Sequence, residues 1–472
     1  MKFLNPRVYA SRVRELLQIF PELRTWVQTL DLEQTHRLRQ SFEKIPFQEW
    51  QALKILSQQV FKKKSLSAKR WTQPPCFMLQ DRQIQSTLWQ QAESRGMQHL
   101  RHGKVAALTV AGGLGTRLSF PGPKGLVPVT PLKRKTLFQV FAEKLRAIER
   151  LHGVRMHWFI MTSSDTHEAT QEAFQKNHWY DTQYLHLFQQ GVLPAFTMDG
   201  MCLLTHEPGV NYYPDGHGGV FKALVSTGCV DKMSAYGIET LSYFQVDNPL
   251  VCIGDCNFLG LHLNRMSDFS TKVVTKTSTD EKVGVFVNKG DVLQLMEYSE
   301  IPGYLSVKKT KDGQLYFKLG NTAMHLIQRS FLEAMAEKKL PIHTTYKAMQ
   351  YWHPLLQSHC SASCQKLEYF IFDALPFAKN PLLLEVDRKE EFSPVKNGHG
   401  QDSLDTCVKD QINRWNRWFA NCGLNVDLGD KAINNAHRLE ISPLFADDYV
   451  SFKKMWNALV VKPNCFENLY LE

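Results

Sequence analysis

The chain has 472 residues, 43% of them hydrophobic and 22% charged, which is an ordinary composition for a globular protein. That length is too great for one simple core and predicts about two or three domains. The net charge of +10 suits nucleic acid, an acidic membrane or a polyanionic substrate, such as one that carries several phosphates. We predict no nucleic-acid binding, because the basic cluster at 62–70 has no recognisable nucleic-acid module beside it.

The sequence carries no sign of membrane insertion or secretion. No apolar run reaches the roughly 18 residues of a membrane helix, and the N-terminus lacks a secretory signal. The 10 cysteines are too sparse for a disulfide scaffold, and pairs such as Cys252/Cys256 lack the C-x-x-C spacing of zinc sites. We therefore predict a cytoplasmic protein with reduced thiols and no membrane partner, either a monomer or a homodimer.

The chain begins with helical periodicity and then changes to alternating strands and helices. Residues 1–100 are predicted to form an N-terminal helical domain, because apolar residues recur at helical spacing between 11 and 45. Thr136 and Asp165 are predicted to begin helices, and Asp199-Gly200 a hairpin turn. Strands are predicted at 105–110, 158–161, 184–188, 241–246, 272–276, 283–287, 292–298, 367–372 and 382–386.

This alternation predicts an α/β fold with a mixed, mostly parallel sheet. The α/β core is expected to cover 101–395, and 396–472 to form a small C-terminal lobe with a docked helix around Trp415 and Trp418. In such a sheet, ligands bind beyond the carboxyl ends of the strands. Polar residues occur where several predicted strands stop: Gln189 and Asp247 follow their strands, and Glu297 lies near the end of its strand.

The most informative segment follows the first predicted strand and reads T-V-A-G-G-L-G-T-R-L-S-F-P-G-P-K at 109–124. Glycine lacks a Cβ, so the backbone at Gly112 and Gly113 can approach a phosphate or a base closely. Leu118 excludes the dinucleotide fingerprint, and Gly125 after Lys124 excludes a P-loop. A strand-to-helix turn with incidental cations is the alternative. The cations Arg117 and Lys124 favour a nucleotide-binding loop, since they supply positive charge for a polyphosphate.

Further motifs occur in a fixed order along the chain. They are A-G-G-L-G-T-R-L (111–118), P-K-G (123–125), F-Q-Q-G-V-L-P-A (188–195), P-D-G-H-G-G (214–219), V-D-N (246–248), E-Y-S-E (297–300), G-N (320–321), F-I-F-D (370–373), F-S-P-V-K-N (392–397) and I-S-P-L (441–444). Together they resemble the eukaryotic-type UDP-N-acetylhexosamine pyrophosphorylases, within the UDP-sugar pyrophosphorylase family. The resemblance covers about 95–445. It implies a Rossmann-like nucleotidyltransferase core that makes a UDP-sugar and pyrophosphate from UTP and a sugar 1-phosphate.

With this resemblance, residues can be assigned to the two substrates. Positioning and charge neutralisation dominate phosphoryl chemistry, so Arg117 and Lys124 are expected to stabilise the triphosphate and Lys396 the sugar phosphate. Asp247 is expected to bind Mg²⁺, although an Asp before Asn248-Pro249 also suits a turn. The uracil is expected to bind backbone groups of Gly112, Gly113 and Gly216 and the Gln189 amide. The sugar is expected to contact His217, Gly284, Glu297 and Asn321, with aromatic walls from Tyr298, Phe370 and Phe372.

One position departs from the N-acetylhexosamine pattern. The P-D-G-x-G-G motif carries His217, where those relatives typically have asparagine and glucose-type relatives typically have histidine. Other motifs follow the N-acetylhexosamine branch, so GlcNAc 1-phosphate is the favoured substrate and glucose 1-phosphate the alternative. A non-catalytic nucleotide-sugar sensor is a remote alternative. The joint presence of Arg117, Lys124, Asp247 and Lys396 argues against it.

Overall fold

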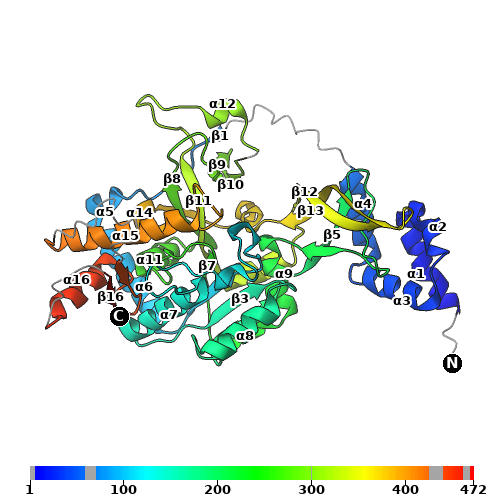
Figure 1. Cartoon of the computed structure of the whole chain (residues 1–472). Coiled ribbons are helices and arrows are strands. Elements are labelled where there is room, and N and C mark those ends of the chain that lie inside the picture. The colour runs from blue at the N-terminus through cyan, green and yellow to red at the C-terminus, as the bar shows by residue number, and fades with distance from the viewer. Residues whose placement is uncertain (1–5, 59–70, 299, 425–438, 461–467) are drawn as a thin grey trace. The chain divides into compact units, whose positions relative to one another are not determined.

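The chain divides into two compact units. The computed structural model describes 6–58, 71–298, 300–424, 439–460 and 468–472, with side chains from residue 13 onward (Figure 1). The basic cluster at 62–70 lies outside these ranges. We call the first unit the hairpin unit; it comprises Met1–Ser67, Gly191–Gly219 and Leu340–Ile371. We call the second the sheet unit; it comprises Ala68–Gln190, Val220–Lys339 and Phe372–Glu472.

The sheet unit is built on a ten-stranded mixed sheet. Its strands are β1 (Trp71–Thr72), β2 (Val105–Val110), β3 (Trp158–Thr162), β4 (Leu185–Gln189), β7 (Thr240–Gln245), β8 (Phe269–Thr275), β9 (Val285–Lys289), β10 (Val292–Met296), β11 (Leu319–Gln328) and β14 (Leu382–Glu385). The strands β7, β2, β3 and β4 lie side by side in that order and run parallel. Beyond β7 follows β11, antiparallel to β7 and to β8, and β8 pairs in parallel with β14. The predicted α/β class is confirmed.

The helices of the sheet unit lie before, between and after its strands in the chain (Figure 1). They are α5 (Asp81–Ile84), α6 (Ser86–Arg101), α7 (Leu137–His152), α8 (His167–Asn177), α9 (Val220–Ser226), α10 (Cys229–Ala235), α11 (Cys256–Asn264), α12 (Gly303–Ser306), α13 (Arg329–Ala336), α14 (Arg388–Glu391), α15 (Leu404–Asn421) and α16 (Tyr449–Ala458). The Thr136 hydroxyl accepts from the Gln139 N–H at 3.2 Å, which confirms the predicted start of α7. Helix α8 begins at His167 and not at the predicted Asp165. The residues before it form a turn, in which the Thr166 hydroxyl accepts from the Ser163 N–H.

The division into units differs from the expected domain boundaries at 100 and 396. Residues 68–100 belong to the sheet unit, because α6 packs tightly on α11. A Cβ atom on Gly96 would lie 1.9 Å from the Cys256 carbonyl oxygen, and one on Gly260 would lie 1.7 Å from that of Ala92. Only glycine permits this approach. The contact joins segments far apart in the sequence, so local periodicity did not reveal it.

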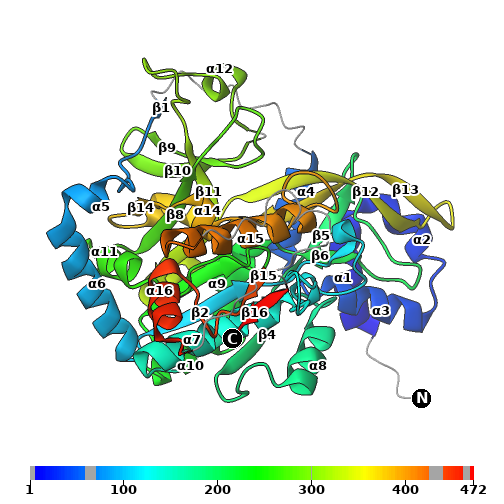
Figure 2. The same cartoon turned by 60° about the vertical axis from the view of Figure 1, so that its left-hand side comes forward.

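The last part of the chain packs as a small lobe within the sheet unit. Helices α15 and α16 and the paired strands β15 (Leu439–Ile441) and β16 (Leu469–Leu471) share an apolar core. Figure 2 shows these orange and red elements together. Trp415 and Trp418 are only 5% and 1% exposed in this core, which confirms the predicted docked helix.

The hairpin unit combines the N-terminal helices with a four-stranded antiparallel sheet of order β12-β13-β5-β6. Its elements are α1 (Pro6–Ile19), α2 (Arg24–Val27), α3 (Leu32–Phe42), α4 (Phe47–Gln58), β5 (Val192–Thr197), β6 (Tyr212–Pro214), β12 (Ile342–His353) and β13 (Ser358–Tyr369). Aromatic side chains join helices and sheet: the Phe20 ring stacks 6.5 Å from that of Phe196. The predicted turn after β5 is confirmed by Gly200, whose φ of +85° favours glycine.

The long hairpin of β12 and β13 was not predicted. Both strands are largely exposed or half-buried and carry few apolar residues in alternation, so the signal of a half-buried strand is absent. The strand expected at 367–372 is only the end of β13, which stops at Tyr369. Phe372 lies instead in a 3₁₀ segment, Ile371–Phe377.

No helix of the described part of the chain is long and apolar enough to cross a membrane. The cysteines of that part all carry free thiols.

One fully buried histidine of α11 is bonded to side chains of β8 and β11. His262 on α11 is 0% exposed, with Nδ1 at 2.7 Å from Ser270 Oγ and Nε2 at 2.9 Å from the Gln328 amide nitrogen. Because that amide donates to Nε2, the ring is neutral and its proton lies on Nδ1. Burial, with a smaller contribution from His99, lowers the pKa of His262 to about 3.

This histidine predicts a loss of stability in acid. An unfolded histidine binds its proton near a pKa of about 6.5, so the unfolded state binds more protons between that value and the folded pKa of about 3. Stability should fall as the pH falls through this window, by about 1.4 kcal/mol per pH unit for this group. We expect the thermal midpoint of His262→Gln to depend less on pH than that of wild type. An unchanged pH slope would contradict this, and His102→Gln on the surface serves as control.

Candidate active site

The glycine-rich segment follows β2 and folds back on itself. The N–H of Gly115 donates to the Gly122 carbonyl at 2.8 Å, and that of Lys124 donates to the Gly113 carbonyl at 3.0 Å. Gly113 and Arg117 are exposed. This closure brings Lys124 beside the glycines and leaves backbone and cations of one loop open to a ligand.

The neighbouring parallel strand supplies a carboxylate to the same place. Because β2 and β7 pair from Val105 to Val110, the residues that follow them emerge side by side. Lys124 Nζ lies 3.4 Å from Asp247 Oδ2, with the two side chains 17% and 13% exposed. The predicted convergence of the two strand ends is therefore present as an ion pair in a partly open position.

The other two parallel strands bring a glutamine to the glycines. The Gln190 N–H donates to the Thr162 carbonyl at 2.9 Å, just beyond β4. A Cβ atom on Gly112 would lie 2.2 Å from Gln190 Oε1, so the Gln190 amide contacts this glycine. Gln189 is exposed at the end of β4. The sequence analysis predicted uracil contact only for Gln189. Successive side chains of a strand point to opposite faces, so two consecutive glutamines do not show which of them faces the glycine loop.

A loop at 392–398, which we call the Lys396 loop, approaches both groups. The Val395 N–H donates to the backbone carbonyl of Asp247 at 2.9 Å. A Cβ atom on Gly398 would lie 3.0 Å from the Arg117 carbonyl oxygen. Lys396 is half-buried, and its Nζ lies 5.8 Å from the centre of the Phe392 ring. The predicted phosphate-binding cations and the predicted metal-binding carboxylate thus lie on segments in direct contact.

Three of the residues predicted to bind the sugar, Gly284, Glu297 and Asn321, form a second group in the sheet unit. The Asn321 N–H donates to the Gly284 carbonyl at 2.9 Å. A Cβ atom on Gly284 would lie 3.2 Å from Glu297 Oε1, so the carboxylate passes directly over this glycine. Tyr298 follows Glu297 and is 47% exposed, whereas Phe372 is buried.

A break in the pairing of β11 with β8 sets the direction of Asn321. The register shifts between Asn321 and Met324, and Ala323 has φ +56°, which is unfavourable for a residue with a Cβ. Asn321 Oδ1 accepts from the Ala323 N–H at 2.9 Å and so stabilises this bulge. Bulges that redirect a side chain are frequent beside functional sites.

The remaining predicted residues, Gly216, His217 and Phe370, lie in the hairpin unit. The motif at 214–219 wraps around Asp215, whose carbonyl accepts from the Tyr369 N–H at 2.7 Å. The His217 ring stacks on that of Phe370 with centroids 5.3 Å apart and an interplanar angle of 11°. The unit therefore brings these three residues together by pairing the motif with the end of β13.

The hydrogen bonding of His217 defines its protonation. Its Nδ1 accepts from the Ile371 N–H at 3.1 Å. Burial lowers the pKa of His217 to about 4, opposed by Glu368 and assisted by His343. The ring is therefore neutral near pH 7 with its proton on Nε2, so that this atom can donate a hydrogen bond.

The carboxylate of Asp247 is compatible with a magnesium ion that arrives with a nucleotide. No group of three or more His, Cys, Asp or Glu suited to a metal occurs among the described residues. Mg²⁺ is commonly held by one or two carboxylates together with waters and substrate phosphates. One partly exposed carboxylate beside the glycine-rich loop fits that pattern.

Parallel strands ending in a glycine loop, a lysine–carboxylate pair and a second lysine on an adjoining loop define a nucleotide-binding α/β protein. The family model described as UTP–glucose-1-phosphate uridylyltransferase matches residues 50–405. The chain belongs to this family, which confirms the resemblance found in its motifs.

Individual relatives of this chain carry names of UDP-sugar pyrophosphorylases. Human UDP-N-acetylhexosamine pyrophosphorylase-like protein 1 is 36% identical over 346 residues, which cover 70% of this chain and 68% of the human protein. UDP-N-acetylglucosamine pyrophosphorylase of Saccharomyces cerevisiae is 32% identical over 352 residues, 71% of this chain and 73% of the yeast protein. The crystal structure of uridine diphosphate N-acetylglucosamine pyrophosphorylase from Trypanosoma brucei shares the fold, with a TM-score of 0.79 at 23% identity over 100% of this chain and 99% of that chain.

Proposed function

We propose that this protein is a UDP-sugar pyrophosphorylase that converts UTP and a hexose 1-phosphate into a UDP-sugar and pyrophosphate, with GlcNAc 1-phosphate as the favoured substrate. Family membership and the names of the human and yeast relatives support the reaction class. The observation that carries the proposal is the Lys124–Asp247 ion pair at 3.4 Å, beside the glycine loop and joined to the Lys396 loop.

The reaction needs charge stabilisation more than covalent catalysis. An oxygen of the sugar phosphate attacks the α-phosphorus of UTP, and the bond from that phosphorus to the bridging oxygen of pyrophosphate breaks. No net proton transfer is required. We assign Lys124 and Arg117 to the charge that develops on pyrophosphate, and Lys396 to the attacking sugar phosphate. Mg²⁺ held by Asp247 would neutralise phosphate charge.

Base recognition is assigned to the backbone of Gly112 and Gly113 and to a glutamine amide, which matches the donors and acceptors of uracil. Gln189, predicted from the sequence, and Gln190, which contacts Gly112, are both candidates. We assign the sugar hydroxyls to Glu297 and Asn321, over the backbone of Gly284.

A panel of sugar 1-phosphates tests the proposal. Purified protein with UTP and MgCl₂ should release pyrophosphate fastest with GlcNAc 1-phosphate, and more slowly with glucose 1-phosphate. Faster turnover of glucose 1-phosphate would assign the chain to the alternative activity. No turnover with any sugar, combined with binding of a UDP-sugar, would favour a non-catalytic sensor. A cytoplasmic location and a monomeric or homodimeric state stay predictions from the sequence.

Removal of the metal-binding charge should change the magnesium requirement. We expect Asp247→Asn to raise the Mg²⁺ concentration for half-maximal activity about tenfold or more, because it removes the ionised ligand. The measurement is a Mg²⁺ titration of activity, together with calorimetric Mg²⁺ binding in the presence of UTP. Asp268→Asn, a carboxylate that accepts from the Lys379 N–H elsewhere in the sheet unit, is the control. An unchanged titration would show that another group binds the ion.

Sugar choice is predicted to depend on His217. Its neutral ring donates only through Nε2, whereas an asparagine amide offers a donor and an acceptor to an N-acetyl group. We expect His217→Asn to raise the ratio of kcat/KM for GlcNAc 1-phosphate over glucose 1-phosphate about tenfold, the value of one hydrogen bond. His343→Asn changes the same ring stack, with centroids 4.2 Å from Phe370, and should leave the ratio unchanged. Equal ratios in wild type and His217→Asn would refute the assignment.

A further inference from the structure

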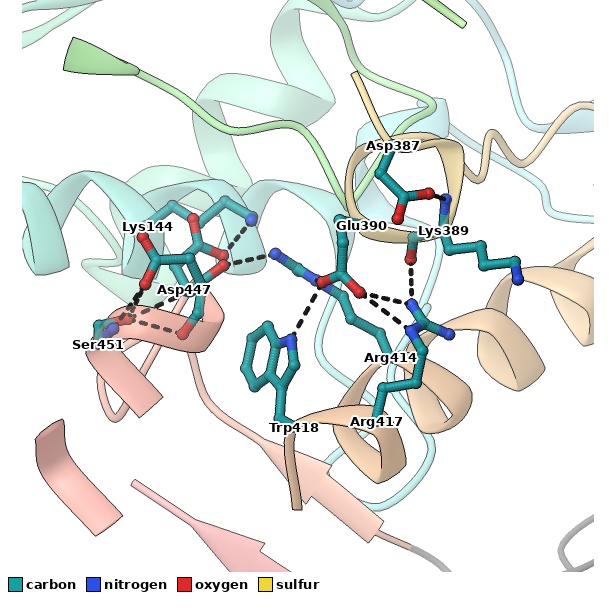
Figure 3. Close-up of polar contacts among 10 residues, drawn as sticks. Lys144, Asp387, Lys389, Glu390, Arg414, Arg417, Trp418, Asp447 and Ser451 are labelled. Carbon is teal, nitrogen blue, oxygen red and sulfur yellow. Dashed lines mark hydrogen bonds and ion pairs between the residues drawn. The ribbon is translucent and has the colours of Figure 1, made fainter. Parts of the chain in front are cut away.

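The short helix α14 lies immediately before the Lys396 loop and is fixed on two sides by its two glutamates. One of them, Glu390, meets helix α15 (Figure 3). Its carboxylate accepts from Arg417 Nε at 3.0 Å, from Trp418 Nε1 at 3.0 Å and from Arg414 Nε at 3.3 Å. A carboxylate that accepts from three donor side chains of one helix is held in a defined place.

The donors of α15 are themselves anchored. Arg414 is 7% exposed and donates from its terminal nitrogen to the Asp447 carbonyl at 2.5 Å. The Asp447 carboxylate pairs with Lys144 of α7, which is 2% exposed (Figure 3). Helix α15 and Asp447 of the C-terminal lobe therefore connect α7 to α14.

The second glutamate connects α14 to the sheet. Glu391 Oε2 lies 2.6 Å from Nζ of Lys272, which is 1% exposed on β8 and also lies 2.7 Å from Asp255 Oδ2. Since Glu390 and Glu391 are consecutive, their side chains leave the helix in different directions. The turn is thereby held between the C-terminal lobe and the sheet.

Asn248, next to Asp247, joins the same segment from the end of β7. It is 3% exposed, and its Nδ2 donates to the Glu391 carbonyl at 2.7 Å. Its Oδ1 accepts from the Ser393 N–H at 3.1 Å. One amide thus binds the last residue of α14 and the start of the Lys396 loop, while the Val395 N–H binds the neighbouring Asp247 carbonyl.

We propose that Asn248 and Glu390 are positioning residues that hold the Lys396 loop against Asp247, so that the Lys396 ammonium meets the sugar phosphate in the reactive arrangement. The inference rests on the proposed function of Lys396. Neither residue is assigned contact with a substrate; both act through the backbone that carries Lys396. A displacement of about 1 Å at such a group can cost about a hundredfold in rate.

A double-mutant cycle tests this inference. We expect Asn248→Leu to lower kcat about tenfold to a hundredfold with KM for UTP within about twofold, since the glycine loop is untouched. Glu390→Met, at a side chain that is 31% exposed, should fold normally and lower kcat less. If Asn248 acts through Lys396, the double variant Asn248→Leu/Lys396→Ala should match Lys396→Ala within about twofold. Multiplying effects would overturn the inference.

Amide hydrogen exchange gives a readout independent of activity. Peptides covering 392–398 should exchange faster in Asn248→Leu and in Glu390→Met, while peptides from β2 keep their protection. Unchanged protection of the Lys396 loop would overturn the positioning role. If Lys396→Ala keeps wild-type kcat, the proposed function of Lys396 fails instead, and that result is visible in the single variant alone.

A matched control separates positioning from general destabilisation. Gln365 is a buried amide, 3% exposed, that donates to the carbonyls of Ser57 and Thr197 at 2.9 Å in the hairpin unit. Gln365→Leu removes the same kind of bonds without touching α14 or the Lys396 loop. It should lower the thermal midpoint while kcat stays near wild type. An equal loss of kcat in Gln365→Leu and Asn248→Leu would refute a specific positioning role.

Discussion

Replacing Lys396 with alanine is expected to lower kcat about a hundredfold to a thousandfold, with KM for UTP nearly unchanged. The attacking sugar phosphate and the α-phosphate are both anionic, and the reaction brings them together. An ammonium between them reduces this repulsion most when the new bond forms. Its loss should therefore appear in kcat and in KM for the sugar phosphate, and not in nucleotide binding.

The contacts of the loop support this division. The Lys396 loop is bonded to the Asp247 backbone through Val395, and it approaches the glycine-rich segment where Gly398 lies beside the Arg117 carbonyl. The part of that segment around Gly113 is closed by its own hydrogen bonds. If UTP binds the glycine loop as proposed, we expect its affinity to stay nearly unchanged when the Lys396 ammonium is removed. Steady-state kinetics in both substrates, with UTP affinity measured by calorimetry, separates the two effects.

A neighbouring lysine provides the control for net charge. Lys389 is exposed on α14, and its side chain points away from Glu390 (Figure 3). Lys389→Ala removes one positive charge near the same loop and should change kcat less than about twofold, because exposed charges are screened. A loss confined to KM for UTP in Lys396→Ala would show that the residue binds the nucleotide and that the assignment is wrong.

The parallel strands and the glycine-rich loop after β2 could be predicted because their signals are local. A buried apolar strand, glycines and two cations occur within 105–124, and the register of β2 with β7 then places Asp247 beside Lys124. The carboxyl-edge rule for parallel sheets predicts that these strand ends converge, but not the ion pair itself. The same rule located the end of β4, but not which of Gln189 and Gln190 contacts Gly112.

Features that depend on contacts between remote segments could not be predicted. The hairpin unit gathers three separate stretches of chain, and β12 and β13 carry too few buried residues to show strand periodicity. The pairing of Glu390 with Arg417 could not be predicted either, because charged residues on helices usually lie on solvent-exposed faces. Such polar contacts become visible only when the tertiary structure brings the partners together.

Replacing Lys272 with methionine is expected to destabilise the sheet unit by about 3–5 kcal/mol. The ammonium lies between the carboxylates of Asp255 and Glu391 at 2.7 and 2.6 Å, and its side chain is 1% exposed. Despite burial, these two charges hold the pKa of Lys272 above its ordinary value. Methionine fills similar space but leaves both carboxylates without a cation in a buried place.

The pH dependence of this loss distinguishes its cause. Without the ammonium, burial and mutual repulsion raise the folded pKa of the carboxylates above the unfolded value of about 4. A raised folded pKa stabilises the protein at low pH, and this contribution disappears as the pH rises. The deficit of Lys272→Met relative to wild type should therefore be small near pH 5 and largest near pH 8. A deficit independent of pH would mean that lost packing, and not unpaired charge, destabilises the variant.

A surface ion pair of the same length shows what burial contributes. Lys104 lies 2.6 Å from Glu239, but the two side chains are 39% and 49% exposed. Because solvent screens such a pair, Lys104→Met should cost less than about 1 kcal/mol and show little change with pH. Adding Asp255→Asn and Glu391→Gln to Lys272→Met should restore much of the lost stability, since no buried charge is then unpaired. If Lys104→Met and Lys272→Met lower the urea midpoint equally, burial of Lys272 with its two carboxylates does not increase the free energy lost when the cation is removed.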